Sequence, residues 1–234
     1  MKNTAIVLAG GRGSRMQSDI PKQYMEIEGR TVLFYSLKQF QDCSLIDEIV
    51  LVAGSDDVEF CKKTYIEEHK LTKIKKIVCG GKERYESVMN GLTAVDEGYV
   101  FIHDGARPCI TEELIISLYE DVKKYKATVA AVPVKDTVRI SDDEGNAIHT
   151  PNRANVWLVQ TPQVFDVALI KSAYNKMKFE VSDKTITDDA MIIEEFAHQK
   201  VHLTYGDYLN IKITTPEDIG VVKGFLKKLK KIKN

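Results

Sequence analysis

Short apolar runs alternate with longer amphipathic stretches from the N-terminus to about Pro133. The apolar runs are rich in branched side chains and predict buried strands at Ala5 to Leu8, Glu48 to Val52, Ile74 to Val78, Tyr99 to His103 and Thr128 to Val132. The stretches between them predict helices at Thr31 to Gln41, from the polar turn at Ser55 to about His69, at Arg84 to Val95 and at Thr111 to Tyr125. Strands separated by helices indicate βαβ units, so we expect an α/β fold with a mostly parallel sheet flanked by helices.

The alternation stops at Lys135, and the residues that follow are polar and rich in turn formers. Asp142 to Asn146 has the composition of a hairpin tip, and the candidate strands on either side are Thr137 to Ile140 and Ala147 to His149. This pattern predicts a protruding β-hairpin arm over residues 136–153. Because a lone hairpin buries little surface, we expect the arm to pack on a partner chain; a free surface hairpin is the alternative.

The C-terminal part of the chain returns to regular elements. Strands are expected at Val156 to Val159 and Asn210 to Thr214, and helices from near Asp166, from Thr187 to about His198 and from Thr215 onward. The lysine-rich end of the last helix complements the helix dipole, which favours a solvated terminus over a binding patch. No repeat or low-complexity linker interrupts the sequence, so residues 1–234 are predicted to form a single domain that carries the arm.

Composition narrows the class of protein. Apolar residues make up 44% of the 234, charged residues make up 29%, and the formal net charge is -1. This balance argues against a general polyanion binder, so no nucleic-acid partner is expected. The four cysteines form no C-x-x-C pair, which is typical of a reducing compartment. With no apolar run long enough to span a bilayer and no signal pattern, we expect a cytoplasmic protein without a membrane partner.

A glycine-rich loop follows the first predicted strand. Gly10, Gly11 and Gly13 let the backbone approach an anion closely, and Arg15 and Lys22 add positive charge at the same place, so the loop is a candidate phosphate site. A tight connection without a ligand is one alternative. A dinucleotide fingerprint is another, but Met16 stands where its third glycine belongs, and a Walker loop fails because no Gly-Lys-Ser/Thr follows.

Two further loops follow predicted strands and should meet the glycine loop at the carboxyl edge of the sheet, namely Cys79 to Arg84 and His103 to Pro108. They contribute cations, amides and Asp104, but no nucleophile paired with a base. This inventory suits phosphoryl or nucleotidyl transfer, in which an ionised phosphate oxygen attacks without help from a protein base.

Three side chains near this edge have two interpretations each. Asp104 is the best candidate for a Mg²⁺ carboxylate, or it is a loop acid bonded to its own backbone. Arg107 reaches an anionic substrate, or it forms a salt bridge with an acid such as Asp104. Lys212 is a placed cation, or a solvated residue of an edge strand.

Several motifs together resemble the 2-C-methyl-D-erythritol 4-phosphate cytidylyltransferase family of isoprenoid precursor synthesis. They occur in order from the N-terminus to the last helix: Leu8 to Met16, Pro21 to Gln23, Gly80 to Arg84 with Ser87, His103 to Pro108, Pro133 to Thr137, Gln160 to Gln163, Thr187 to Ala190, and Asn210 to Thr214. The resemblance implies a Rossmann-like nucleotidyltransferase fold, a homodimer joined by the hairpin arm, and Mg²⁺-dependent transfer of CMP from CTP to a polyol phosphate with release of pyrophosphate.

The resemblance also implies roles for individual residues. Arg15, Lys22 and Lys212 would be catalytic, and Asp104 would bind the metal. Arg107, Thr187 and Lys212 would position methylerythritol phosphate, with Thr137 and Arg153 reaching across from the other subunit. The residues implied to bind CTP are Leu8, Ala9, Gly10, Gly11, Gly13, Arg15, Lys22, Gly81, Ser87 and Asp104.

Two departures leave the substrate open. The family often reads Pro-Ala-Ala-Gly and His-Asp-Ala-Ala-Arg, whereas this chain has Leu8 to Gly11 and Gly105. Both differences lean toward ribitol-5-phosphate cytidylyltransferases of wall and capsule synthesis, which are the alternative in the same reaction class. Against that, Val132 to Thr137 and Asp188 to Ala190 with Glu194 are closer to the methylerythritol branch, so 2-C-methyl-D-erythritol 4-phosphate is the expected acceptor of CMP. A nucleotide-binding regulator without turnover is the alternative from another class, and an NAD-dependent oxidoreductase is disfavoured by Met16.

Overall fold

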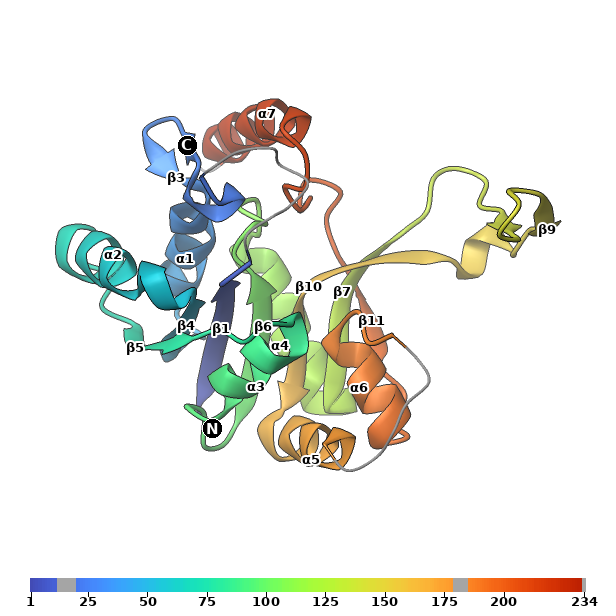
Figure 1. The fold of residues 1–234 in the computed structure, drawn as a ribbon, viewed down its shortest axis with the longest axis horizontal. Coiled ribbons are helices and arrows are strands. Elements are labelled where there is room, and N and C mark those ends of the chain that lie inside the picture. The colour runs from blue at the N-terminus through green and yellow to red at the C-terminus, as the bar shows by residue number, and fades with distance from the viewer. Residues whose placement is uncertain (12–19, 179–184, 233–234) are drawn as a thin grey trace.

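The computed structural model of the chain describes residues 1–11, 20–178 and 185–232. Its centre is a seven-stranded sheet in the order β11-β7-β10-β6-β1-β4-β5 (Figure 1). The strands are β1 (Asn3–Ala9), β4 (Glu48–Ala53), β5 (Ile74–Cys79), β6 (Tyr99–Asp104), β7 (Ala127–Pro133), β10 (Trp157–Asp166) and β11 (His202–Tyr205). Neighbours pair in parallel except β10, which runs antiparallel to both β6 and β7. The predicted mostly parallel α/β sheet is confirmed.

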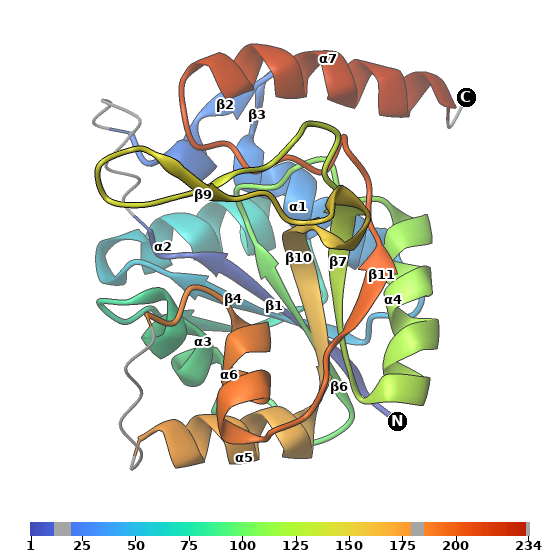
Figure 2. The same ribbon diagram turned by 90° about the vertical axis from the view of Figure 1, so that its right-hand side faces the viewer.

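Helices cover both faces of the sheet (Figure 2). The alternation along β1 decides which core each side chain joins: Ala5 and Val7 lie in one apolar cluster, and Ile6 lies in the other. The first cluster packs against α1 (Val32–Asp42), α2 (Val58–Cys61), η4 (Lys62–Glu68) and α4 (Glu112–Tyr125), and the second against α3 (Arg84–Leu92), α5 (Val167–Met177) and α6 (Asp189–Phe196). The result is a three-layer α/β/α arrangement.

The predicted helix starts lie where the capping residues place them. The Thr31 hydroxyl accepts a hydrogen bond from the Phe34 amide at 3.2 Å at the start of α1, and Thr111 caps α4 in the same way. The stretch after Ser55 is helical as expected, but it divides into η3 (Ser55–Asp57), α2 and the π-helix η4. None of these helices, within the part of the chain that the structure describes, is both long and apolar enough to cross a bilayer.

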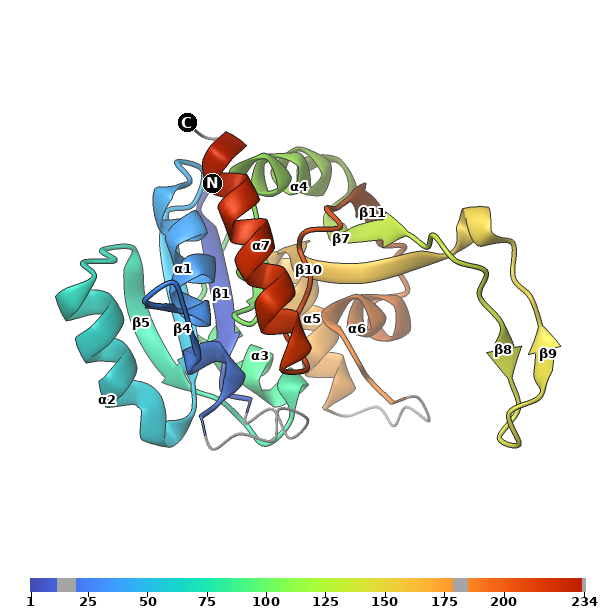
Figure 3. The same cartoon turned by 90° about the horizontal axis from the view of Figure 1, so that it is seen from above.

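A third, smaller core joins the C-terminal helix to the N-terminal loops. Ile213, Val222 and Leu226 pack with Ile27 and Val32, so α7 (Glu217–Ile232) lies over one end of α1 beside the small strands β2 (Glu26–Ile27) and β3 (Arg30–Thr31) (Figure 3). This contact holds the residues that precede α7 against the end of the sheet.

A hairpin arm projects from the sheet between β7 and β10 (Figures 1 and 3). Its two short strands are β8 (Ile140–Ser141) and β9 (Ala147–His149), whose residues are all exposed, and the 3₁₀ turn η5 (Arg153–Asn155) lies at its base. The exposed large apolar side chains Ile140 and Ile148 lie on these strands.

Two strand assignments need correction. Asn210 to Thr214 is not a strand; the alternation there arises because Ile211 and Ile213 pack in the small core under α7, and the Ile213 amide donates to the carbonyl of Ala106, which lies in a turn. The edge strand β11 was not predicted. In addition, β10 continues past Val159 to Asp166 and includes Pro162. A proline has no amide to donate, and it is tolerated here because the register with β7 is broken between Val159 and Gln163.

Candidate active site

A cavity of about 220 Å³ lies at the carboxyl ends of β1 and β6, next to the start of α3. A wider trough of about 840 Å³ continues from it past the end of β5 and shares Gly10, Gly11, Gln23, Gly81 and Lys82 with it. The position agrees with the predicted meeting of three loops. The cavity is lined by Leu8, Ala9, Gly10, Gly11, Lys22, Gln23, Gly81, Lys82, Glu83, Arg84, Ser87, Asp104, Ala106 and Lys212.

The buried side chain of Gln23 joins the two ends of the glycine loop. Its Nε2 donates hydrogen bonds to the carbonyl oxygens of Ala9 and Gly11, at 2.6 and 2.9 Å. Gln23 lies in the short helix η2 (Lys22–Tyr24), which follows Pro21, and Lys22 of the same turn lines the cavity. The η2 turn therefore bonds to the start of the glycine loop through Gln23 and brings the positive charge of Lys22 to the cavity.

The second wall is the start of α3. Glu83 and Glu86 form a capping box, and the Ser87 hydroxyl accepts a hydrogen bond from the Gly81 amide at 3.0 Å. A Cβ on Gly81 would lie 2.3 Å from the Cβ of Glu86, so no other residue fits here without moving the helix. The close approach brings the backbone of Gly81 and Lys82 to the cavity edge.

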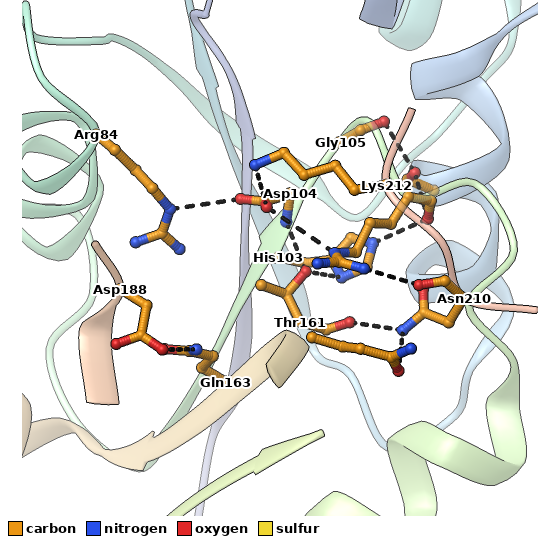
Figure 4. Close-up of polar contacts among 12 residues, drawn as sticks. Arg84, His103, Asp104, Gly105, Thr161, Gln163, Asp188, Asn210 and Lys212 are labelled. Carbon is orange, nitrogen blue, oxygen red and sulfur yellow. Dashed lines mark hydrogen bonds and ion pairs between the residues drawn. The ribbon is translucent and has the colours of Figure 1, made fainter. Parts of the chain in front are cut away.

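Asp104 ends β6 and lies among three cations (Figure 4). Its Oδ2 is 2.8 Å from Lys212 Nζ and 4.0 Å from Arg107 Nε, and its Oδ1 is 3.5 Å from Arg84 Nε. Burial disfavours the charged carboxylate, but the Arg84, Lys212 and Arg107 charges outweigh it and hold the pKa of Asp104 well below its ordinary value. The carboxylate stays ionised and orients the cations around it.

A buried network behind Asp104 locks the end of β6 (Figure 4). The Thr161 hydroxyl accepts a hydrogen bond from the Asp104 amide at 3.0 Å and lies 3.1 Å from His103 Nδ1. His103 Nε2 lies 3.1 Å from the Arg107 carbonyl, which can only accept, so Nε2 carries the proton and Nδ1 accepts from Thr161. Burial lowers the pKa of His103 to about 4, so the ring is neutral at physiological pH.

This shift predicts a pH-dependent stability. The unfolded chain binds a proton on His103 near its ordinary pKa of 6.5, whereas the folded chain resists protonation down to about 4. Stability is therefore lost as the pH falls through this window, by up to about 1.4 kcal/mol per pH unit. Urea unfolding at several pH values should give a flatter profile for His103→Gln than for the original chain, whereas His149→Gln, on the exposed arm, should leave the profile unchanged. Equal profiles for all three proteins would contradict the assignment.

The structure brings most of the predicted site residues together. Leu8, Ala9, Gly10, Gly11, Lys22, Gly81, Ser87, Asp104 and Lys212 line the cavity. Arg107 contacts Asp104, which agrees with its interpretation as a salt-bridge partner of this acid. Lys212 also contacts Asp104, which agrees with its interpretation as a placed cation. Gly13 and Arg15 lie outside the described residues.

Three predicted residues lie elsewhere. Thr187 is exposed just before α6, with its hydroxyl on the Met191 sulfur at 3.1 Å. Thr137 and Arg153 belong to the arm, where Arg153 Nη1 donates to the Lys135 carbonyl at 3.0 Å. The cavity of the same chain does not include these three side chains.

Sequence reasoning did not assign roles to several cavity residues, notably Gln23 and Arg84. Gln23 follows Lys22 directly within the quoted Pro21 to Gln23 motif, and Arg84 closes the Gly80 to Arg84 motif. Besides Asp104, Arg84 pairs with Asp189. Asp189 lies far from Arg84 in the sequence, and no local pattern connects the two residues. Their pairing depends on the tertiary structure alone.

The predicted Mg²⁺ site can be tested against the donor set. No group of three or more His, Cys, Asp and Glu side chains that could hold a metal occurs among the described residues. Asp104 provides one carboxylate toward the cavity, and it is already paired with cations. Mg²⁺ usually takes one or two protein carboxylates together with phosphate ligands, so an ion bound here would share the Asp104 carboxylate with the cations around it.

Comparison with known proteins identifies the relatives of the chain. The family model IspD, described as 2-C-methyl-D-erythritol 4-phosphate cytidylyltransferase, matches residues 3–228. A protein of this name from Lachnospira eligens is 48% identical over 96% of this chain and 99% of its own length. One from Alkaliphilus oremlandii is 47% identical, over 97% and 95%.

Solved structures give the same result. The 4-diphosphocytidyl-2C-methyl-D-erythritol synthase of Anaerococcus prevotii has a TM-score of 0.82 at 38% identity, covering 97% of this chain and 98% of that one. The 2-C-methyl-D-erythritol 4-phosphate cytidylyltransferase of Francisella tularensis has a TM-score of 0.79 at 31% identity, covering 96% and 100%. These names do not favour the ribitol alternative.

Proposed function

Because the chain belongs to the 2-C-methyl-D-erythritol 4-phosphate cytidylyltransferase family, we propose how the residues around its cavity carry out the transfer of CMP from CTP to methylerythritol phosphate. The observation that carries the proposal is the carboxyl-edge cavity, where backbone amides and several cations lie around the buried carboxylate of Asp104. Such a site can hold a polyphosphate and offset charge that develops on it.

CTP occupies the cavity along the glycine loop. Leu8, Ala9, Gly10 and Gly11 form one wall, and Gly81 with Ser87 forms the other, so the nucleotide lies between the end of β1 and the start of α3. Lys22 and Asp104 lie at the same cavity. Gly13 and Arg15, assigned from the family motif, complete the phosphate site in this proposal.

The reaction is a displacement at the α-phosphorus of CTP. An oxygen of the methylerythritol phosphate group attacks, a new P–O bond forms, and the bond to the pyrophosphate oxygen breaks, so the electron pair leaves with pyrophosphate. The attacking oxygen is already ionised near neutral pH, and therefore no protein base is needed. Lys22 and Arg15 stabilise the charge that builds on the α-phosphate oxygens.

The second substrate is oriented by the cations around Asp104. Lys212 lies 35% exposed at the cavity, so its ammonium can contact a phosphate group while Asp104 holds it. Arg107 lies behind it, with Nη1 donating to the Asn210 carbonyl at 2.8 Å. Thr187, which precedes α6, is the further contact to methylerythritol phosphate that the family motif implies.

Mg²⁺ and a second copy of the chain complete the proposed enzyme. Asp104 would hold Mg²⁺ together with the CTP phosphates, and the ion would neutralise phosphate charge when bound. The arm joins a homodimer, in which Thr137 and Arg153 reach the partner's substrate. The exposed Ile140 and Ile148 on the arm support such a contact.

We place the enzyme in the cytoplasm, without nucleic-acid or membrane partners. Its four free cysteines support a reducing compartment.

Pyrophosphate release from CTP tests the function directly. With methylerythritol 4-phosphate as acceptor we expect rapid release, and with ribitol 5-phosphate we expect release at least about 100-fold slower at equal concentration, as is typical when polar groups of a site lose their partners. Preference for ribitol 5-phosphate would overturn the substrate. Binding of CTP without release for either acceptor would favour the non-catalytic regulator.

A further inference from the structure

Arg84 connects the cavity to a buried acid that lies outside it. Its Nη2 is 2.8 Å from Asp189 Oδ2, and its Nε is 3.5 Å from Asp104 Oδ1. Burial opposes the positive charge, but Asp189 and Asp104 outweigh it and raise the pKa of Arg84 above its ordinary value. The guanidinium is therefore a permanent cation with one side on the cavity and the other on α6.

The acid behind Arg84 is held by two other elements. Asp189 is fully buried, and its Oδ1 accepts a hydrogen bond from the Tyr174 hydroxyl of α5 at 2.6 Å. Gln163 of β10 accepts from the amides of Asp189 and Ala190, both at 3.0 Å, and donates to Asp188 at 2.8 Å (Figure 4). These bonds satisfy the first amides of α6 and leave Asp189 little freedom to move.

In front of Arg84, the two oxygens of Asp104 are divided between different cations. Oδ1 faces Arg84, whereas Oδ2 faces Lys212 at 2.8 Å (Figure 4). The backbone next to Lys212 is held, because the Ile213 amide donates a hydrogen bond to the Ala106 carbonyl at 2.9 Å, but the lysine side chain is long, flexible and 35% exposed. The orientation of the Asp104 carboxylate therefore determines where the Lys212 ammonium lies.

We propose that Arg84, anchored by Asp189, is a positioning residue for Lys212: it fixes the rotation of the Asp104 carboxylate and so directs Oδ2 at the Lys212 ammonium. This inference rests on the proposed role of Lys212 in orienting the methylerythritol phosphate. Without Arg84, Oδ1 loses its cation, and the carboxylate is free to rotate away from the orientation in which Oδ2 faces Lys212 and Arg107, so the ammonium leaves its place. An arginine suits this role because its fork spans two carboxylates at once.

A double-mutant cycle on turnover tests the proposal. Arg84→Gln is expected to lower kcat by about 10- to 100-fold, since a misplacement near 1 Å has effects of this size. The KM for CTP should change by less than about 3-fold, because Arg84 acts through Lys212, which orients methylerythritol phosphate and not the nucleotide. In a Lys212→Met background, Arg84→Gln should have less than about a 3-fold further effect, because a residue that acts through Lys212 has nothing left to position.

Two further variants separate positioning from folding. Arg84→Gln leaves Asp189 buried without its cation. The paired variant Arg84→Gln with Asp189→Asn removes both charges and so leaves no buried charge unpaired; it is expected to fold and to show the same loss of kcat. Arg30→Gln is the matched control, since Arg30 lies over the Phe34 ring at 5.3 Å and away from the cavity, and it should keep full activity. Thermal unfolding of each variant verifies that the protein assayed is folded.

The outcomes distinguish this inference from the proposed function. Full activity of Lys212→Met would overturn the proposed role of Lys212, and this inference with it. Loss of activity in Lys212→Met together with full activity in Arg84→Gln would overturn this inference alone. Additive losses in the cycle would also overturn it, because they would assign Arg84 a contact of its own with a substrate.

Discussion

Asp104→Asn is expected to lower kcat by about 1,000-fold and to lower the free energy of unfolding by about 3 kcal/mol. The side chain of Asp104 is 11% exposed and is the carboxylate around which Arg84, Arg107 and Lys212 lie. An asparagine of the same shape removes the negative charge and leaves three cations facing one another. Their repulsion both moves Lys212 and destabilises the end of β6.

Measuring turnover and urea unfolding on the same preparation tests both parts of this prediction. Asp42→Asn is the control, because Asp42 forms an exposed pair with Lys38 on α1, and its loss should change stability by less than about 0.5 kcal/mol. A variant at Asp104 that unfolds at the urea concentration of the original chain would show that the cations are stabilised by other groups. Normal turnover would remove Asp104 from the mechanism.

Lys22→Ala is expected to lower kcat by about 100- to 1,000-fold while the KM for CTP changes by less than about 3-fold. Lys22 reaches the cavity from the turn that Gln23 fixes to the glycine loop. If its charge acts mainly on the α-phosphate as negative charge develops, it stabilises the transition state more than the bound nucleotide. Steady-state kinetics with varied CTP at saturating methylerythritol phosphate separate the two effects.

Lys62→Ala provides the control for loss of a lysine. Lys62 is exposed on η4, away from the cavity, and its replacement should leave both constants unchanged. Equal losses in kcat and in CTP affinity for Lys22→Ala would show that this lysine only holds the nucleotide. An unchanged kcat would show that the lysine has no part in the chemical step.

The glycine loop and the arm show how far local sequence patterns reach. A run of branched residues followed by glycines predicts a strand that ends in a phosphate loop, and β1 with Gly10 and Gly11 at the cavity agrees with it. The polar turn-rich stretch after Lys135 predicts the protruding arm, because alternation and turn residues are local properties. The family motifs identified the relatives correctly as well.

The segment before α7 shows where local patterns fail. Asn210 to Thr214 alternates like a strand, yet it pairs with none, because its apolar side chains pack under α7 rather than on a sheet. The Ile213 amide donates instead to the Ala106 carbonyl at 2.9 Å in the loop after β6, and this contact brings Lys212 to Asp104. A period of two reports only that alternate side chains are buried, and it does not report what buries them.

Local patterns and ordered motifs were enough to predict the α/β class, the order of most elements, the glycine loop and the family, since each depends on residues that are close together or on motifs in a fixed order. Three contacts could be found only in the folded chain: Arg84 meets Asp189, Gln163 caps α6, and Asp104 divides its two oxygens between cations from different elements. These contacts join residues from distant parts of the chain, and their geometry exists only once the strands, helices and loops that carry them have packed together.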